Sequence, residues 1–329
     1  RQNLKVLTDA TVTKLIIRDG AAVGVELIQH TRSQIFSAHA EIILTAGAIG
    51  SPHILQLSGI GSGKLCQSHG IVNVCDQPNV GKHLQDHLGI NYFHLANRPT
   101  LNNVLGSWPH LIIAGVNYIM RRKGPLSLGV NQLGGLVRAT PDASRLDTQL
   151  YINPITYSVT DDDTRRLTKP DRAPGFALSF NSCRPYSAGS VYIKSADAAM
   201  PPAIHGNYLD DQRDIKDVLR MARFIGRMQN SPSVQKLLAA PPETNLLALS
   251  DNEIIDDFRA RSGTVFHPCG TCRMGPDRRH SVVDPQLRVH GVGKLRVADA
   301  AIFPNITSAN TNAPTIAVAH KAADLILQS

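Results

Sequence analysis

One histidine in the chain is placed where it could act as a general base. His267 opens the segment His267-Pro-Cys-Gly-Thr-Cys-Arg-Met-Gly275 and stands just before a glycine-containing turn. Histidine is the side chain whose ordinary pKa lets it take up and return a proton near neutral pH. A single His followed by Pro is more often a structural loop residue, so a catalytic role needs support from the rest of the chain.

A glycine-containing turn could face an anion or a cofactor. Residues 40–45 form a short, almost continuous apolar run, which is typical of a strand buried on both faces. The run leads into Ala46-Gly-Ala-Ile-Gly-Ser-Pro52, where Ser51 can cap a helix and Pro52 suits its first turn. A strand, a turn and a helix N-terminus can together bind an anion, but a tight connection without a ligand fits the pattern equally well.

A carboxylate and an amide follow near the end of the chain. A strand predicted at residues 295–298 delivers Asp299 at its C-terminal end, which is the edge where ligands bind in open α/β sheets. Asn312 lies near the N-cap of a helix predicted from about Pro314 to Leu327. We expect the positive end of that helix dipole to face the cleft.

Both strands and helices are expected to position these residues. Alternating apolar residues and turn signals predict a β-meander near the start and an antiparallel sheet in a second domain. The strands are expected at 4–8, 12–17, 22–27, 148–152, 176–180 and 190–194, with a charged loop at 161–166. Helices are expected at 111–120, 210–238 and 251–261, the last with Ser250 as its cap and Glu253 in capping-box position.

Composition limits the function classes. The chain has 329 residues, 42% of them hydrophobic and 18% charged, which suits a globular protein of two domains or of one large domain. The net charge of +8 is dispersed, which argues against nucleic-acid binding, and no apolar run is long enough to span a membrane. Five cysteines favour a reducing compartment, and the Cys269/Cys272 pair has no second pair that would favour a metal or redox site.

The motifs together resemble the glucose-methanol-choline (GMC) family of flavin oxidoreductases, and most closely its choline-dehydrogenase and alcohol-dehydrogenase branch. Five stretches spread over the chain carry the resemblance: Gly47 to Gly61, Val80-Gly-Lys-His-Leu-Gln-Asp-His87, Arg184 to Ser190, His267 to Gly275, and Val297 to Thr315. Several long motifs in the right order are far more specific than any one of them.

The resemblance implies an α/β (α+β) fold made of a partial FAD-binding domain and a substrate-binding domain built on an antiparallel sheet. We expect residues 1–88 and 255–329 to form the first domain and residues 89–254 the second. Members of the family carry, ahead of the part seen here, a G-x-G-x-x-G motif that holds the ADP half of FAD, and this chain contains none. With Arg1 already in a strand-like pattern, we interpret the chain as a segment whose N-terminal FAD-binding part is missing or lies on another segment.

The resemblance also assigns roles to residues. His267 matches the base that takes the proton of a substrate hydroxyl, and Asn312 matches the partner that positions the substrate while a hydride passes to flavin N5. The residues expected to contact FAD are Val12, Ala46, Gly47, Asp299, Ala300, Asn312, Pro314 and Thr315, with backbone N–H groups from about Thr315 onward stabilising charge on the reduced flavin.

The expected activity is oxidation of a primary alcohol to an aldehyde, with a quinone or oxygen as the electron acceptor. Two alternatives stay open: a non-catalytic fragment, and a hydroxynitrile lyase on the same scaffold. We expect a cytoplasmic location, with peripheral attachment to a membrane left open.

Overall fold

The computed structural model describes residues 2–129, 131–162 and 165–328, and it divides into two compact units. The first unit consists of the chain up to Asp86, residues Pro185–Asp210 and the chain from Phe266 onward. The second unit consists of His87–Arg184 and Asp211–Val265. Residues 185–210 belong to the first unit, although the sequence prediction placed them in the second domain, because their strand β14 pairs with β7 of the first unit.

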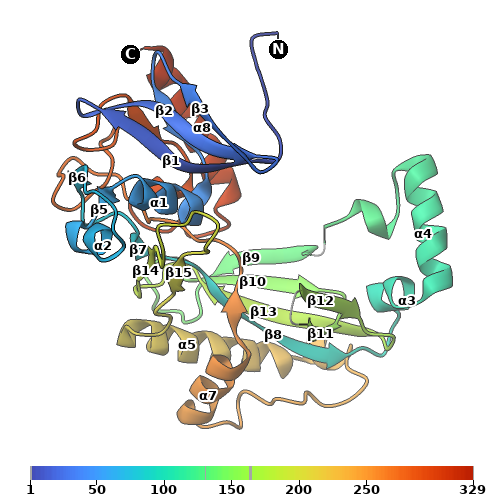
Figure 1. Ribbon diagram of the computed structural model, residues 1–329. Coiled ribbons are helices and arrows are strands. Elements are labelled where there is room, and N and C mark those ends of the chain that lie inside the picture. Colours follow the sequence, from blue (N-terminus) through green and yellow to red (C-terminus); the bar gives the residue numbers. More distant parts are fainter. Residues whose placement is uncertain (1, 130, 163–164, 329) are drawn as a thin grey trace. The chain divides into compact units, whose positions relative to one another are not determined.

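The first unit begins with the expected meander (Figure 1). Its strands are β1 (Ala10–Arg18), β2 (Ala21–Gln29) and β3 (Arg32–Ser37), all antiparallel to their neighbours. Residues 4–8, which were predicted as a strand, precede β1 and do not pair. Leu15 and Ala22 point from this meander into the core of the unit.

A pair of parallel strands lies at the centre of the first unit. Strand β4 (Ile42–Leu44) pairs with β17 (Leu295–Val297), although some 250 residues separate them in the sequence. Helix α1 (Gly47–Leu57) follows β4, and the short 3-10 helix η2 (Ala300–Ile302) follows β17. The buried side chains of Leu44, Val297 and Ile302 belong to one hydrophobic cluster, so both strand ends are held by packing.

The remaining elements of the first unit are short apart from the C-terminal helix. They are β5 (Ile60–Gly61), α2 (Gly63–Ser68), β6 (Cys75–Asp76), β7 (Lys82–Leu84), β14 (Gly189–Tyr192), β15 (Ala203–His205) and α8 (Asn312–Leu327). Strand β14 lies between β15 and β7 in a three-stranded sheet.

The second unit is built on a five-stranded antiparallel sheet of order β16-β8-β13-β10-β9. These strands are β16 (Gly263–Thr264), β8 (Leu88–Leu95), β13 (Gly175–Ser182), β10 (Thr148–Asn153) and β9 (Leu133–Val137). Between β10 and β13 the chain forms a separate hairpin of β11 (Tyr157–Asp162) and β12 (Arg165–Pro170). The expected α/β fold, with an antiparallel sheet in a second unit, is confirmed.

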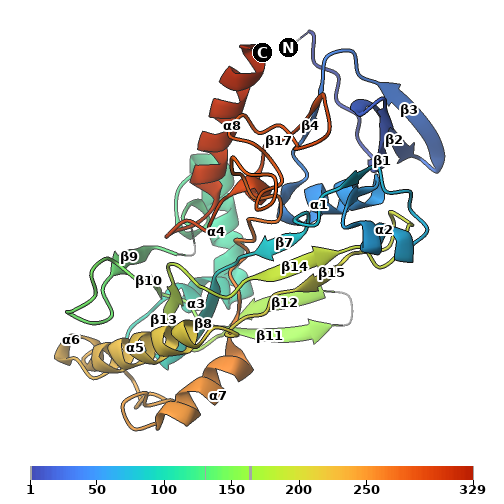
Figure 2. The same ribbon diagram turned by 90° about the vertical axis from the view of Figure 1, so that its left-hand side faces the viewer.

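The second unit also contains helices, and Figure 2 shows that one of them, α5, runs along the strands of the sheet. They are α3 (Leu101–Leu105), α4 (Trp108–Arg121), the 3-10 helix η1 (Pro125–Ser127), α5 (Gln212–Gln229), α6 (Pro232–Gln235) and α7 (Asp251–Arg261). Met221 and Ile225 on α5 are buried, as are Phe180 on β13 and Phe258 on α7, whose rings stack with centroids 5.9 Å apart. No helix in the described part of the chain is both long and apolar enough to cross a bilayer.

Three sequence expectations about element bounds are corrected. The helix predicted at 210–238 ends at Gln229, because Ser231 caps a new helix in which Pro232 takes the first position. The charged loop predicted at 161–166 is mostly strand, as Asp161 faces Arg166 across the β11–β12 hairpin, and residues 163–164 lie outside the described residues. The helix after β4 starts at Gly47, four residues before Ser51.

Candidate active site

Main-chain hydrogen bonds fix the His267 segment to two other parts of the first unit. Cys269 and Gln85 exchange N–H to carbonyl bonds of 2.9 and 3.1 Å, which ties the segment to the stretch after β7. The N–H groups of Gly270 and Cys272 donate to the carbonyls of Ala300 and Ala301 in η2 at 3.1 and 2.8 Å. The chain around His267 is therefore held on both sides by backbone rather than by flexible side chains.

His267 is buried, with 8% of its surface exposed, and its ring has a defined partner. The Asn310 amide nitrogen Nδ2 lies 2.9 Å from the imidazole Nε2. When the amide donates this bond, Nε2 is the unprotonated ring nitrogen, which is the state a general base requires. Burial lowers the pKa of His267, because an imidazolium loses solvation there, while the nearby Asp86 carboxylate acts in the opposite direction.

Asp86 orients the histidine from its backbone side. Its Oδ1 accepts the main-chain N–H of His267 at 2.9 Å, and its Oδ2 accepts the Tyr208 hydroxyl at 2.7 Å. Asp86 is itself buried, so its negative charge acts on the imidazole through a poorly screened medium. The same carboxylate thus fixes the position of His267 and favours its protonated form once a proton arrives.

The asparagine beside His267 is Asn310, two residues before the one that the resemblance selected. Asn312 is the first residue of α8 and is exposed, with Thr311 as the N-cap. Thr315, expected to offer its N–H to the cofactor, already donates it to the Thr311 carbonyl at 3.0 Å. The main-chain donors at the start of α8 are therefore those of Asn312 and Ala313, since Pro314 has no N–H.

Asp299 occupies the N-terminus of α1. Its Oδ2 accepts the Gly47 N–H at 2.9 Å and the Ser51 hydroxyl at 2.6 Å, and its Oδ1 accepts the Ala301 N–H at 2.7 Å. A carboxylate is favourable there because of the helix dipole. The carboxylate of Asp299 thus occupies the anion-binding corner that the sequence indicated after β4. Ser51 does not cap α1 but lies inside this helix and donates to that carboxylate.

The proline inside α1 links this helix to the His267 segment. Pro52 has no N–H to give to the carbonyl four residues earlier, which belongs to Ala48. That carbonyl instead accepts the hydroxyl of Thr271 at 2.6 Å, and both Thr271 and Ser51 are completely buried. A side chain of one motif that carried the resemblance therefore satisfies a main-chain carbonyl of another.

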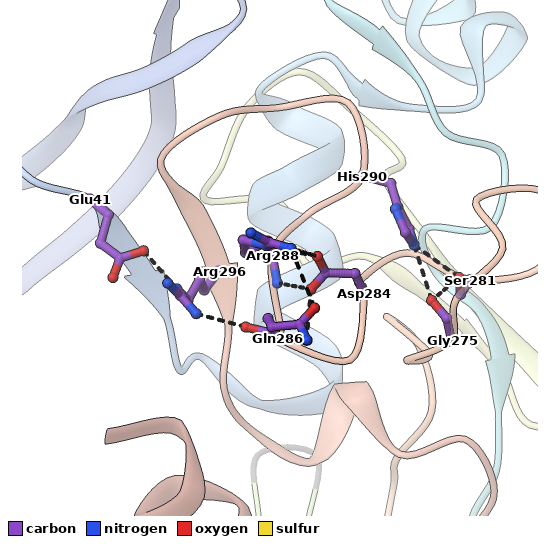
Figure 3. Close-up of polar contacts among 8 residues, drawn as sticks. All are labelled: Glu41, Gly275, Ser281, Asp284, Gln286, Arg288, His290 and Arg296. Carbon is purple, nitrogen blue, oxygen red and sulfur yellow. Dashed lines mark hydrogen bonds and ion pairs between the residues drawn. The ribbon is translucent and has the colours of Figure 1, made fainter. Parts of the chain in front are cut away.

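A buried ion pair clamps the two parallel strands that deliver Asp299 and Gly47 (Figure 3). Arg296 on β17 donates through Nε to the Glu41 carboxylate at 2.7 Å and through Nη1 to the Gln286 carbonyl at 2.8 Å. The Arg296 side chain is 5% exposed and that of Glu41 17%. Next to it, Asp284 holds Arg288 in an exposed pair of 2.7 Å.

The loop between the His267 segment and β17 is closed by a second polar group. Ser281 donates to the Gly275 carbonyl at 2.9 Å, and its hydroxyl lies 3.1 Å from Nε2 of His290 (Figure 3). The loop is thus ordered by its own contacts, which keeps the segment after His267 in place.

The first unit has the features that a flavin cofactor needs close to this site. Gly47 has φ of +81°, and a Cβ placed on it would meet nothing within 4 Å, so the backbone there is open to an approaching group. Ala46 is exposed, as are Asn312 and Ala313 at the dipole end of α8. The residues present therefore fit the expected cofactor.

The other expected cofactor residues occupy ordinary structural positions. Val12 lies on β1 opposite Leu27, next to an irregularity in the pairing, and is half-buried. Ala300 opens η2, and Pro314 lies in the first turn of α8.

The two cysteines of the His267 segment contribute main-chain hydrogen bonds to the site, and their thiols are buried. Cys269 and Cys272 are free and buried, and burial raises the pKa of Cys269 to about 12 and that of Cys272 well above its ordinary value. The described residues contain no group of three or more His, Cys, Asp or Glu side chains that could hold a metal ion.

Sequence reasoning missed Asn310, Asp86, Tyr208 and Thr271. Asp86 and Thr271 lie within motifs that were recognised as wholes, so those motifs were the available signal. Nothing in the sequence separates Asn310 from Asn312, because the choice depends on where α8 begins. Tyr208 carries no signal of its own.

Comparison with known proteins identifies the family behind this arrangement. Family models described as GMC oxidoreductase match residues 1–89 and 185–319. The alcohol dehydrogenase [acceptor] of Pseudomonas putida is 39% identical over 100% of this chain and 59% of its own length. Human mitochondrial choline dehydrogenase is 33% identical over 99% of this chain and 54% of its own length.

A solved structure is similar to this chain over most of its length. The formate oxidase of Aspergillus oryzae, solved in a study of its FAD modification, superposes with a TM-score of 0.86 at 26% identity, covering 96% of this chain and 59% of that one. The chain thus spans less than two thirds of the length of these relatives. The expected family and its cofactor, FAD, are confirmed.

Proposed function

The chain belongs to the GMC oxidoreductase family, and from that premise we propose that it takes part in FAD-dependent oxidation of a primary alcohol to an aldehyde. The observation that carries the proposal is the 2.9 Å contact between the buried His267 Nε2 and the Asn310 amide. This pair combines a proton acceptor with a donor that can hold an oxygen atom.

The proton leaves the alcohol through His267. A hydroxyl group that enters between the two side chains donates its proton to Nε2 of His267 and accepts a hydrogen bond from Nδ2 of Asn310. Asn310 thereby positions the oxygen, and it stabilises the alkoxide that develops as the proton moves. The imidazolium that results is stabilised by the charge of Asp86 behind it.

When bound, FAD supplies the acceptor for the hydride that leaves the alcohol carbon. The chain's contribution is to receive negative charge at the dipole end of α8, whose first residues, Asn312 and Ala313, are exposed. The open backbone at Gly47 provides the close approach. Asp299 contributes indirectly, by fixing the start of α1.

The relatives support the proposed substrate class. An alcohol dehydrogenase and a choline dehydrogenase are among them, which supports a primary alcohol as the electron donor. The name of the first relative specifies an acceptor, which supports transfer of the electrons onward to a quinone or to oxygen.

Flavin absorbance provides the test. Protein loaded with FAD is mixed anaerobically with a series of primary alcohols, choline included, and bleaching of the oxidised-flavin band is followed in time. We expect His267→Ala to slow bleaching by about 10²–10⁴-fold, as for loss of a general base. Asn310→Ala should slow it by about tenfold or more, as for loss of a hydrogen bond to a charged group.

The control is His110→Ala, which removes an exposed histidine of α4 in the second unit and should leave the rate unchanged. Absence of bleaching with every alcohol, in protein that retains FAD, would contradict the proposal. Equal rates for the His267 and His110 variants would contradict the assigned base.

A further inference from the structure

A polar cavity of about 400 Å³ opens in the first unit and takes no part in the chemistry described above. Its lining residues come from three segments, 79–83, 188–207 and 273–280. Its volume lies at the lower end of the range for small-molecule sites, about 300–1,000 Å³.

The cavity gathers positive charge. Lys82 and Arg273 bring two permanent cations to its walls, and His83 and His280 add two imidazoles. Within the described part of the chain, no Asp or Glu is among the residues that line it. Such a wall attracts anions, because an anion reduces the repulsion between the like charges.

The hydrogen bonds already present leave that charge unneutralised. Arg273 donates through Nε and Nη2 to the main-chain carbonyl of His280 at 3.2 and 2.7 Å, which fixes the guanidinium but offers it a neutral acceptor. His83 Nε2 lies 3.0 Å from the Pro304 carbonyl, so its ring is also held. Burial lowers the pKa of His83, and the charge of Arg273 lowers it further.

Neutral donors and an aromatic wall complete the cavity. Ser190 and Asn207 line it, and Asn207 is anchored by a 3.3 Å bond from Nδ2 to the Ala188 carbonyl. Tyr192 is the aromatic residue of the lining. Cations, neutral donors and one apolar wall suit a ligand with an anionic group and an organic part.

We propose that this cavity binds the phosphate group of a small phosphate monoester, with Lys82 and Arg273 as its charged contacts. A dianionic phosphate matches two permanent cations better than a monoanionic carboxylate does. The cavity is large enough for an organic group to lie against Tyr192 while the phosphate contacts the cations.

Titration calorimetry at low salt tests the proposal with three probes. Glycerol 3-phosphate should bind, inorganic phosphate should bind more weakly, and glycerol should not bind. Equal affinity for glycerol 3-phosphate and inorganic phosphate would overturn the organic part of the proposal. Absence of heat with both anions would overturn the site.

Variants separate this cavity from general surface charge. Lys82→Gln and Arg273→Gln should each weaken glycerol 3-phosphate binding by about tenfold or more, since each removes a charge-assisted contact. Lys82 is exposed, so its replacement leaves folding intact even if Arg273→Gln does not. The matched control is Lys64→Gln, which removes an exposed lysine of α2 outside the cavity. An unchanged affinity in Lys82→Gln, or an equal loss in Lys64→Gln, would refute the assignment.

Discussion

Replacing Arg296 by methionine should strongly destabilise the first unit. The guanidinium bonds Glu41 and the Gln286 carbonyl, and its side chain is only 5% exposed. Removing one partner of a buried pair costs about 3–5 kcal/mol, because the other charge is left without compensation. Glu41, at 17% exposure, regains some water, so we expect the lower end, about 3 kcal/mol.

Arg288→Met, in the loop that precedes β17, is the control. Arg288 pairs with Asp284 at the same 2.7 Å, but its side chain is 59% exposed. An exposed pair contributes about 0–1 kcal/mol, so this variant should lose no more than that. Both pairs have an arginine 2.7 Å from a carboxylate that is 17% exposed, so the main difference between the two variants is the burial of the arginine.

Urea unfolding measures both losses in the free energy of unfolding. The double variant Glu41→Met with Arg296→Met should recover at least half of the loss, because no buried charge then remains unpaired. Equal losses for Arg296→Met and Arg288→Met would refute the reasoning. Failure of the double variant to recover any stability would show that Arg296 acts through packing alone.

Four further outcomes follow from the structure. Ser51→Ala removes the 2.6 Å donor to buried Asp299 and should cost about 1.5–3 kcal/mol in urea unfolding; a loss below about 0.5 kcal/mol would contradict the role of that bond. The pKa of His267 is lowered from 6.5 by burial, so kcat/KM for alcohol oxidation should rise with pH and level off above an apparent pKa below 6.5, and a limb above pH 7 would count against this base. Because the unfolded chain binds that proton more readily, the stability contributed by this group is present above pH 6.5 and is lost as the pH falls through the folded-state pKa. Gly59→Ala should cost clearly more stability than Gly20→Ala, since both have φ near +76° but a Cβ on Gly59 would lie 2.1 Å from a carbonyl oxygen and one on Gly20 would meet nothing; equal melting temperatures would contradict the clash.

Elements whose ends depend on neighbouring residues were predictable. The helix at Asp251–Arg261 begins where Ser250 and Glu253 indicated, and the structure contains both bonds of that capping box. The meander from β1 to β2 likewise follows from its alternation and from the turn at Gly20. In each case the deciding interactions join residues only a few positions apart, so the pattern contains them.

Other predictions depended on partners that are far away in the sequence. Ser51 fits a helix cap by every local rule, yet it lies inside α1 because Asp299, 248 residues later, holds the start of the helix at Gly47. Pro52 would normally open a helix, and it is tolerated in the interior because Thr271 satisfies the carbonyl that it leaves free.

By itself, the sequence determined the family, the cofactor and the identity of His267 as the candidate base, because these rest on residue types in a fixed order. Only the tertiary structure decided that Asn310 rather than Asn312 lies beside that base, that Asp86 and Tyr208 support it, and that Asp299 fills the corner after β4. The physical reason is that hydrogen bonds act over about 3 Å in space, whereas the residues joined here are separated by 43 to 252 positions in the chain.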